Sequence, residues 1–367
     1  MYFLCTGCRK EISSPLKPVW LCDCGMPLEV HYSWEGNIRS IDVDDTELSL
    51  WRYSSVLPNV KNNITLGEGH TPLFPIGENI LVKDETVNPT GSFKDRGMAL
   101  AVTMAKAQGV QNICLPSAGN AGISAAAYCN KAEIKCHVYL PETIPEPFKK
   151  ETEKYKAEIF LSGETISDAA KKMLKEKQDD WFDISTLKEP FRVEGKKTLG
   201  YEIAEQMGWK FPDVIIYETG GGTGLIGMWK AFIELKALGW VSGKLPRMVA
   251  AQSDGCAPVV KAFQNLQNKT DFWENSNTIA LGLNVPGPLG GAWILDVLYQ
   301  SSGIAISIAE NQLSDLTEEF NSLTNLNASA EAGVVWGAYN TLLDMNWINH
   351  KETVVLFATG VERCKFK

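Results

Sequence analysis

A lysine at a predicted strand-to-helix turn offers the first candidate chemistry in this sequence. Lys94 lies in the segment PTGSFKDRG, where Ser92 and Asp95 predict a capping box and therefore a helix with Lys94 in its first turn. The positive end of a helix disfavours an ammonium group, and partial burial adds to that cost. Although most lysines near helix starts are simply solvated, this position suits a neutral amine that forms an imine with an aldehyde.

A glycine-rich segment supplies a second candidate, for a phosphate group. Residues 218–227 read ETGGGTGLIG and lie between a predicted strand and a predicted helix, whose first amides are suited to binding phosphate. The segment also fits the dinucleotide fingerprint GxGxxG, which expects an acidic residue about 20 positions later. Position 242 is a serine, and Asp254 lies more than 30 residues from the first glycine of that fingerprint. We call this predicted phosphate-binding turn the glycine cradle, and its expected residues are Gly220, Gly221, Gly222, Thr223 and Gly224.

Two close cysteine pairs near the amino terminus are suited to metal binding. Their separation of about a dozen residues lets four thiolates surround one tetrahedral zinc ion, although the second pair has one intervening residue instead of two. Residues 1–36 carry three basic and four acidic side chains, which favours a structural zinc ribbon over a nucleic-acid module. Four thiolate ligands leave no open coordination position on the zinc ion for catalysis. Metal binding would supply the folding energy of this short segment, which has too little core to fold unaided. The predicted ligands are Cys5, Cys8, Cys22 and Cys24.

The elements that position these residues follow an α/β pattern. From about residue 65, short apolar runs alternate with longer helical patterns, which predicts mostly parallel sheets covered by helices. Four apolar runs end in small, polar turns, and ligands bind at the carboxyl ends of strands in open α/β sheets. We expect the four turns to converge on one site. The runs begin at Ile80, Ile113, Val214 and Val354.

The string PTGSFKDRG closely resembles the Schiff-base motif of the threonine synthase and threonine dehydratase group of enzymes. The resemblance implies that Lys94 holds pyridoxal 5'-phosphate (PLP) as a Schiff base and that Phe93 borders its pyridine ring. It also implies fold type II of the PLP enzymes, with two open, mostly parallel sheets and flanking helices. Because a dinucleotide site leaves the lysine motif unexplained, we prefer PLP to a nicotinamide cofactor.

Two further segments resemble cofactor-binding parts of this group. The segment SAGNAG is similar to an asparagine loop, which implies that Asn120 hydrogen-bonds the ring hydroxyl of PLP while Ser117 and Ala118 receive the substrate carboxylate. Thr359 matches the position where this group places a neutral hydroxyl against the pyridine nitrogen. A neutral partner implies a weaker electron sink, suited to eliminations and replacements.

Other matches concern the substrate. The segment FRVEGKKT resembles an arginine segment, which implies that Arg192 binds a phosphate leaving group while Lys196 and Lys197 add positive charge. The segment GEGHTPL resembles one that lies over the substrate, with Thr71 as a candidate contact. Two departures bear on substrate choice. Residues 361–366 read VERCKF where the group usually has a glycine-rich, lysine-containing run, and DISTLKEP lacks an Asn-Ser pair that often helps to hold substrate phosphate.

Composition excludes several other classes of protein. With 35 basic and 44 acidic residues in 367, the net charge of −9 disfavours binding to nucleic acid or anionic membrane. No apolar run approaches the roughly 20 residues of a membrane helix, and the first residues lack the order of a signal peptide. Nine cysteines, odd in number, argue against a disulfide framework. We expect a cytoplasmic enzyme with a small anionic amino-acid substrate, and family habit implies a homodimer.

The resemblance covers nearly the whole chain and implies a threonine synthase, which converts O-phospho-L-homoserine and water to L-threonine and phosphate. A dehydratase or β-replacement enzyme acting on threonine, serine or phosphoserine is the alternative within the class. An NAD-dependent dehydrogenase and a non-catalytic zinc-ribbon protein are alternatives from other classes. The predicted domains are a zinc ribbon at 1–36, a large PLP-binding domain at 37–95 and 190–367, and a smaller α/β domain at 96–189.

Overall fold

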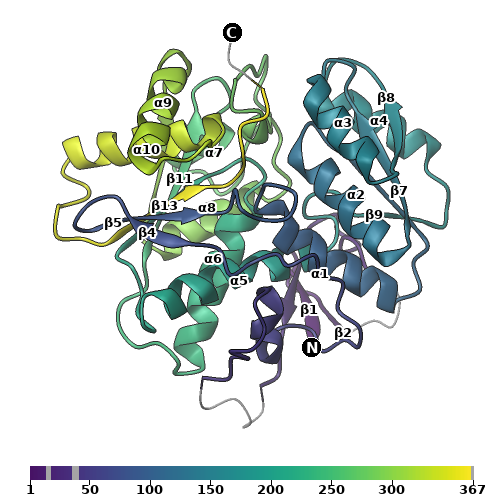
Figure 1. Ribbon diagram of the computed structural model, residues 1–367, viewed down its shortest axis with the longest axis horizontal. Coiled ribbons are helices and arrows are strands. Elements are labelled where there is room, and N and C mark those ends of the chain that lie inside the picture. Colours follow the sequence, from purple (N-terminus) through teal and green to yellow (C-terminus); the bar gives the residue numbers. More distant parts are fainter. Residues whose placement is uncertain (14–17, 35–40, 365–367) are drawn as a thin grey trace. The chain divides into compact units, whose positions relative to one another are not determined.

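The computed structural model describes residues 1–13, 18–34 and 41–364 and divides the chain into two compact units (Figure 1). Unit 1 consists chiefly of Met1–Ile38, Asp42–Gly69 and Asn88–Lys196. Unit 2 consists chiefly of His70–Val87 and Lys197–Lys367. The division falls inside helix α5, so the first turns of α5 belong to unit 1 and the rest to unit 2.

Unit 1 contains a four-stranded parallel sheet in the order β8-β7-β6-β9. Its central strands are short apolar runs buried on both faces, as expected for a parallel sheet covered by helices. The strands are β6 (Asn112–Pro116), β7 (Lys135–Leu140), β8 (Glu158–Leu161) and β9 (Trp181–Asp183). The helices are α1 (Lys94–Ala107), α2 (Asn120–Ala132), α3 (Glu146–Lys154), α4 (Ile166–Glu176) and the start of α5 (Phe191–Gln206), with a 3-10 helix at Leu50–Val56.

A small antiparallel sheet at the amino terminus, in the order β2-β1-β3, shares the hydrophobic core of unit 1. The ring of Phe3 packs edge-on against that of Phe191 at the start of α5, with centroids 5.8 Å apart. The indole of Trp20 donates to the carbonyl of Asp183 at 3.0 Å. Packing of this kind lets a segment too small for its own core be stabilised by the rest of unit 1. The strands are β1 (Tyr2–Cys5), β2 (Glu11–Ser13) and β3 (Leu28–His31).

Unit 2 contains a six-stranded sheet in the order β12-β11-β10-β13-β5-β4, parallel except for β4. Helices α9 and α10 cover one face, and α6 and α8 the other (Figure 1). The strands are β4 (Leu73–Pro75), β5 (Ile80–Asp84), β10 (Val214–Glu218), β11 (Arg247–Ser253), β12 (Ile304–Ile308) and β13 (Val354–Ala358). The helices are α6 (Thr223–Ala237), α7 (Pro258–Gln264), α8 (Gly291–Gln300), α9 (Leu313–Thr324) and α10 (Ala330–Asp344), with 3-10 turns at Leu281–Leu283 and Glu310–Gln312.

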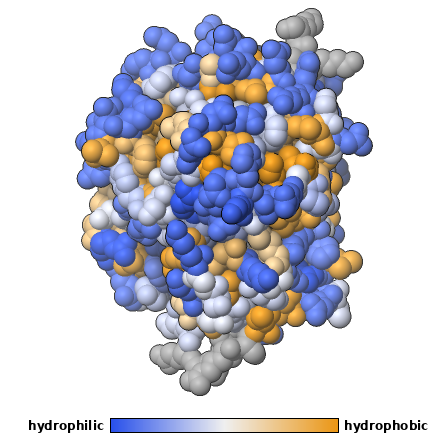
Figure 2. Space-filling view, turned by 90° about the vertical axis from the view of Figure 1, so that its left-hand side faces the viewer, coloured by the Kyte–Doolittle hydropathy of each residue, from blue (hydrophilic) through white to orange (hydrophobic). Residues whose placement is uncertain are grey.

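The predicted α/β class, with two mostly parallel sheets and a small amino-terminal segment, is confirmed. Three of the four predicted site strands, β10, β13 and β5, are neighbours in unit 2, whereas β6 belongs to the sheet of unit 1. Hydrophilic side chains cover most of the face drawn in Figure 2, with hydrophobic residues in smaller groups between them. In the described part of the chain, every helix is too short or too polar to span a bilayer.

Candidate active site

The lysine turn in unit 1 has the predicted helix but not the predicted cap. Helix α1 begins at Lys94, whose side chain is partly exposed, and its N-cap position is Phe93. The predicted capping box is wrong, because the N-cap position is Phe93 and Ser92 lies one residue before it, where its side chain does not cap the helix. Asp95 is instead fully buried and accepts hydrogen bonds from the amide and hydroxyl of Thr90, at 2.6 and 2.5 Å, and from the hydroxyl of Ser124 at 2.6 Å.

Two lysine side chains lie against the ring of Phe93. The Nζ of Lys94 is 4.1 Å from the ring centroid, and the Nζ of Lys196 is 4.5 Å from it. Lys196 has no exposed surface, and burial lowers its pKa well below the ordinary value, with the charges of Lys94 and Arg192 acting in the same direction. The sequence predicted only that Lys196 adds positive charge near the substrate. Its position at the Phe93 ring, beside Lys94, arises from the tertiary structure.

The asparagine turn follows strand β6, as predicted. Asn120 is the first residue of α2. The hydroxyl of Ser117 accepts from the amides of Gly119 and Gly122 at 3.2 and 2.9 Å, and donates to the carbonyl of Gly119 at 3.0 Å. Ser117 therefore shapes the turn that presents Asn120 and the neighbouring Ala118. The contacts predicted for these residues with cofactor and substrate stay predictions.

Arg192 is buried near the start of α5. One guanidinium nitrogen donates to the carbonyl of Ile184 at 2.8 Å, while Nε has no hydrogen-bond partner among the described residues. Burial lowers the pKa of Arg192, opposed by the negative charges of Glu189 and Asp183, but a guanidinium remains charged under all ordinary conditions. A buried cation with a donor to spare suits an anionic group, which fits the predicted phosphate contact.

Lys197 has a different environment from its neighbour Lys196. Its Nζ lies 3.0 Å from the carboxylate of Glu234, which also accepts from the hydroxyl of Tyr201 at 2.8 Å, all within unit 2. Lys197, which the sequence suggested as a substrate contact, is thus already paired with the carboxylate of Glu234. The substrate role of Lys197 stays a prediction.

The glycine turn in unit 2 links β10 to α6 and has the geometry of an anion cradle. Gly222 has a φ of +79°, which strongly favours glycine, and a Cβ on Gly224 would lie 2.2 Å from the Oη of Tyr217. The first amides of α6 point out of the helix end and are suited to binding phosphate. Because β13 pairs in parallel with β10, Thr359 follows the neighbouring strand at the same sheet edge. The structure therefore brings the cradle and Thr359 to one edge, as predicted.

Thr71 is held by a buried polar cluster in unit 2. Its hydroxyl donates to Glu85 at 2.6 Å and its amide donates to Glu202 at 2.8 Å. Lys83, fully buried, donates to the carbonyl of Thr71 and to Glu202, each at 2.6 Å. Sequence reasoning missed Lys83, Glu85 and Glu202, although Lys83 inside the apolar strand β5 and Glu85 directly after it were a visible signal. The cluster holds Thr71 through its hydroxyl, its amide and its carbonyl, and each buried charge in it has a partner.

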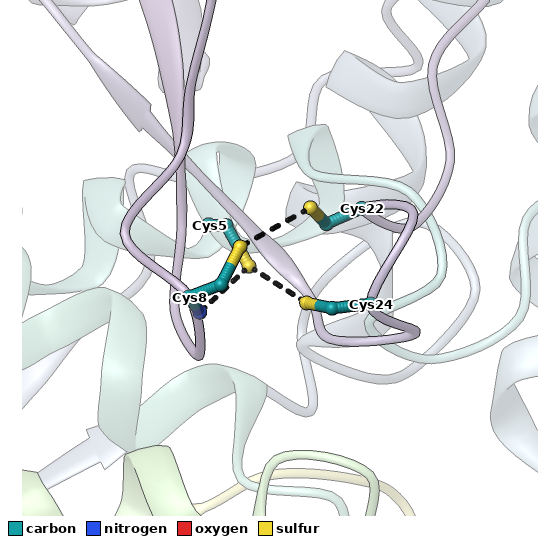
Figure 3. Close-up of side chains that lie close together, drawn as sticks. All are labelled: Cys5, Cys8, Cys22 and Cys24. Atoms are coloured by element: carbon teal, nitrogen blue, oxygen red, sulfur yellow. Dashed lines mark hydrogen bonds between the residues drawn. The ribbon is translucent and has the colours of Figure 1, made fainter.

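The four amino-terminal cysteines form a compact cluster of sulfur atoms (Figure 3). The sulfurs lie within 4.8 Å of one another, with Cys5 and Cys24 3.4 Å apart and Cys8 and Cys22 3.7 Å apart. Tetrahedral zinc with Zn–S bonds of about 2.3 Å requires sulfur separations of about 3.8 Å. The cluster is therefore compatible with a structural zinc ion.

Removing zinc is expected to destabilise unit 1 as a whole. The small sheet contacts α5 through Phe3 and Phe191, and Tyr32 donates to Glu194 at 2.6 Å, so unfolding of the ribbon would expose the start of α5. We expect about one zinc ion per chain by mass spectrometry, and a strong chelator should lower the thermal midpoint by about 5 °C or more. A Cys364→Ser variant should keep the metal, whereas Cys22→Ser should lose it. Zinc-free protein with an unchanged midpoint would contradict this prediction.

Comparisons with known proteins define the class of this chain. Residues 64–360 match the family model described as pyridoxal-phosphate dependent enzyme. The chain belongs to this family. The predicted cofactor, PLP, is confirmed, and the nicotinamide and non-catalytic alternatives are set aside.

Individual relatives refine this picture. A threonine synthase from Methanocaldococcus jannaschii is 30% identical over 365 residues, covering 93% of this chain and 88% of its own length. One from Methanosarcina acetivorans is 31% identical over 377 residues, covering 98% and 91%. Among solved structures, a fungal L-serine ammonia-lyase from Rhizomucor miehei superposes with a TM-score of 0.69 at 19% identity, covering 80% of this chain and 94% of that one. The last likeness shows a shared fold.

The residues present fit PLP. A partly exposed lysine beside an aromatic ring suits an aldehyde-binding amine, and the turn around Gly222 and Gly224 has no room for side chains where a phosphate would lie against amides. Since Lys94 and Asn120 belong to unit 1 whereas the cradle and Thr359 belong to unit 2, each group is defined within its own unit. Convergence of all four turns stays a prediction.

Proposed function

We propose that this protein is a threonine synthase, which converts O-phospho-L-homoserine and water to L-threonine and inorganic phosphate. The observation that carries the proposal is the alignment of more than nine-tenths of the chain with proteins named threonine synthase, at 30% and 31% identity. The buried guanidinium of Arg192 supports it, because a substrate phosphate needs a cation of this kind.

Each candidate residue has a role in this proposal. PLP, when bound, supplies an electron sink that makes protons on the substrate carbon skeleton acidic. Lys94 would hold the cofactor through its side-chain amine, and the same amine would move protons at Cα, Cβ and Cγ of the substrate. Arg192 binds the phosphate as it leaves Cγ, and water then adds at Cβ.

The remaining residues hold the cofactor and substrate. The amides of residues 220–224 bind the cofactor phosphate, while Asn120 and Thr359 hydrogen-bond its ring. Ser117 and Ala118 lie in a turn that receives the substrate carboxylate. The cluster of Thr71 with Glu85 and Glu202 keeps one loop in a fixed conformation, which limits the shapes of substrate that fit.

A paired assay tests the substrate. Phosphate release from O-phospho-L-homoserine is measured beside keto-acid release from L-threonine and L-serine, with the Lys94→Ala variant as a blank. We expect phosphate release, with L-threonine as the product, to exceed keto-acid release by about 100-fold or more in kcat/KM. Keto-acid release that is faster than phosphate release would replace the proposal by the dehydratase alternative. That alternative is favoured by the fold likeness to the fungal ammonia-lyase and to a threonine deaminase from Solanum lycopersicum, with TM-scores of 0.69 and 0.68.

A further inference from the structure

The segment between β9 and α5 orients the guanidinium of Arg192. One nitrogen of this group donates to the carbonyl of Ile184 at 2.8 Å, whereas Nε is buried without a hydrogen-bond partner among the described residues. Arg192 is only 2% exposed, so water does not supply the missing contacts at the protein surface. The position of the Ile184 carbonyl therefore decides where the Nε donor points.

Ile184 directly follows β9, which is the edge strand of its sheet. The amide of Ile184 donates to the carbonyl of Cys114 in β6 at 3.0 Å, so the backbone of Ile184 faces the sheet. Because the backbone groups of successive residues in a strand point in opposite directions, the carbonyl of Asp183 points to the open edge. There it accepts the indole N–H of Trp20 at 3.0 Å. Trp20 thus occupies the hydrogen-bonding position that a further strand would take.

Trp20 belongs to the amino-terminal ribbon, the segment that carries strands β1 to β3 and the four clustered cysteines, and it lies two residues before Cys22. Its ring stacks on Phe182 in β9, with centroids 5.1 Å apart and the planes inclined by 26°. The Nζ of Lys177 lies 5.5 Å from the centroid on the indole. Stacking and the hydrogen bond together hold the indole in one orientation against β9.

Two further residues of the ribbon contact the chain neighbours of Arg192. Phe3 packs against Phe191, and Tyr32 donates to Glu194, as described above. The ribbon therefore contacts β9, the residue before the arginine and the second residue after it, all within unit 1. Apolar packing would be enough to stabilise the ribbon. A hydrogen bond adds direction, since it weakens steeply when donor and acceptor are misaligned.

We propose that the amino-terminal ribbon positions the phosphate-binding arginine, and that Trp20 is the positioning residue through which it acts. The indole holds the carbonyl of Asp183, and this contact fixes the adjacent carbonyl of Ile184. The carbonyl of Ile184 in turn orients the guanidinium of Arg192, so that Nε is available to an oxygen of a phosphate group. The inference rests on the role of Arg192 in the proposed function but not on the rest of the substrate.

The affinity of the full-length enzyme, with its cofactor, for phosphate tests this inference. Trp20→Phe keeps an aromatic ring against Phe182 but removes the N–H donor. We expect inorganic phosphate to bind about 5-fold or more weakly by isothermal titration calorimetry. The KM for O-phospho-L-homoserine should rise by a similar factor, with kcat changed by less than about 2-fold. The cofactor absorbance and the circular dichroism should match those of the wild type.

The control is another aromatic residue of the ribbon. Tyr2 stacks on His31 with ring centroids 5.3 Å apart, so Tyr2→Phe changes the same small sheet but leaves the contact with β9 intact. This variant should retain the wild-type affinity for phosphate. Trp20→Met, which keeps an apolar contact with Phe182 but has no donor, is measured in parallel and should show the same loss as Trp20→Phe.

A double variant separates positioning from general stability. Arg192→Lys keeps a cation but removes the Nε donor, and it should bind phosphate more weakly than the wild type. In that background Trp20→Phe should cause no further loss, because two residues that act through one contact are not additive. Wild-type affinity in Trp20→Phe would overturn the proposal. The same loss in the Arg192→Lys background would also overturn it, as would a wild-type enzyme that binds no phosphate.

The proposed function can fail separately. If the wild-type enzyme bound inorganic phosphate but were inactive toward O-phospho-L-homoserine, the assignment as a threonine synthase would be wrong. The phosphate titrations of the single and double variants would still decide whether Trp20 acts through Arg192.

Discussion

The Lys94→Ala variant is expected to purify without covalently bound cofactor and to lose about 10³-fold or more of its activity. Lys94 is the first residue of α1, partly exposed and 4.1 Å from the Phe93 ring centroid, and in the proposed function it supplies both the covalent bond and the mobile proton. The measurements are the visible absorbance of the purified protein and the mass of its peptides after borohydride reduction. Wild-type protein should carry the added mass on the peptide that contains Lys94.

The matched control is another lysine of the same helix. Lys106 is exposed and donates to the carbonyl of Ala132 at 2.7 Å, so Lys106→Ala should keep the chromophore and the activity. The nearby Lys196 makes the experiment more stringent, because it is the other amine at the same ring. If the reduced cofactor were found on Lys196 in the wild-type protein, the assignment of Lys94 would be wrong even though the protein would still be a PLP enzyme.

The Gly195→Ala variant is expected to lower the free energy of unfolding by about 3 kcal/mol and to weaken cofactor binding. Its Cβ would lie 2.0 Å from the carbonyl oxygen of Arg96 and 3.0 Å from the Cα of Gly97. These are backbone atoms, which cannot rotate aside as a side chain can, so α1 and α5 would have to move apart. That movement would change the positions of Lys94 and Lys196 together. Urea unfolding followed by circular dichroism measures the first effect, and PLP titration measures the second.

A glycine with space around it provides the comparison. Gly77 lies in an exposed turn of unit 2, where an added Cβ would meet only the flexible end of Ile80 at 3.3 Å. Gly77→Ala should therefore change the free energy of unfolding by about 0.5 kcal/mol or less. Equal stability of Gly195→Ala and Gly77→Ala would show that the helix crossing tolerates a methyl group, and that the positions of Lys94 and Lys196 beside the Phe93 ring do not depend on it.

Local sequence signals were reliable where one short segment decides the structure. The helix start at Lys94, the strand-turn-helix around Gly222 and the cysteine knuckles depend on residues close together in the chain. Ser92 and Asp95 show the limit of this reasoning. Their spacing satisfied the pattern for a capping box, but the carboxylate of Asp95 is bound by Thr90 and by Ser124, which comes from another helix. A buried carboxylate is stabilised by the donors that packing brings to it, whatever its spacing suggests.

The adjacent lysines of α5 show the same division. As sequence, Lys196 and Lys197 are equivalent cations, and only Lys197 was assigned to the substrate. Consecutive residues of a helix point about 100° apart, so packing places one beside Phe93 and the other beside Glu234.

The sequence by itself determined the α/β class, the lysine turn, the glycine cradle, the cysteine cluster and the enzyme family, because each of these is written in residue types at short spacing. Only the tertiary structure decided which charged side chains share a buried environment. The helix crossing at Gly97 and Gly195 and the cluster of Lys83 with Glu202 join residues nearly 100 or more positions apart. Such pairs arise from packing of whole elements, and the cost of burying a charge depends on the partners found there.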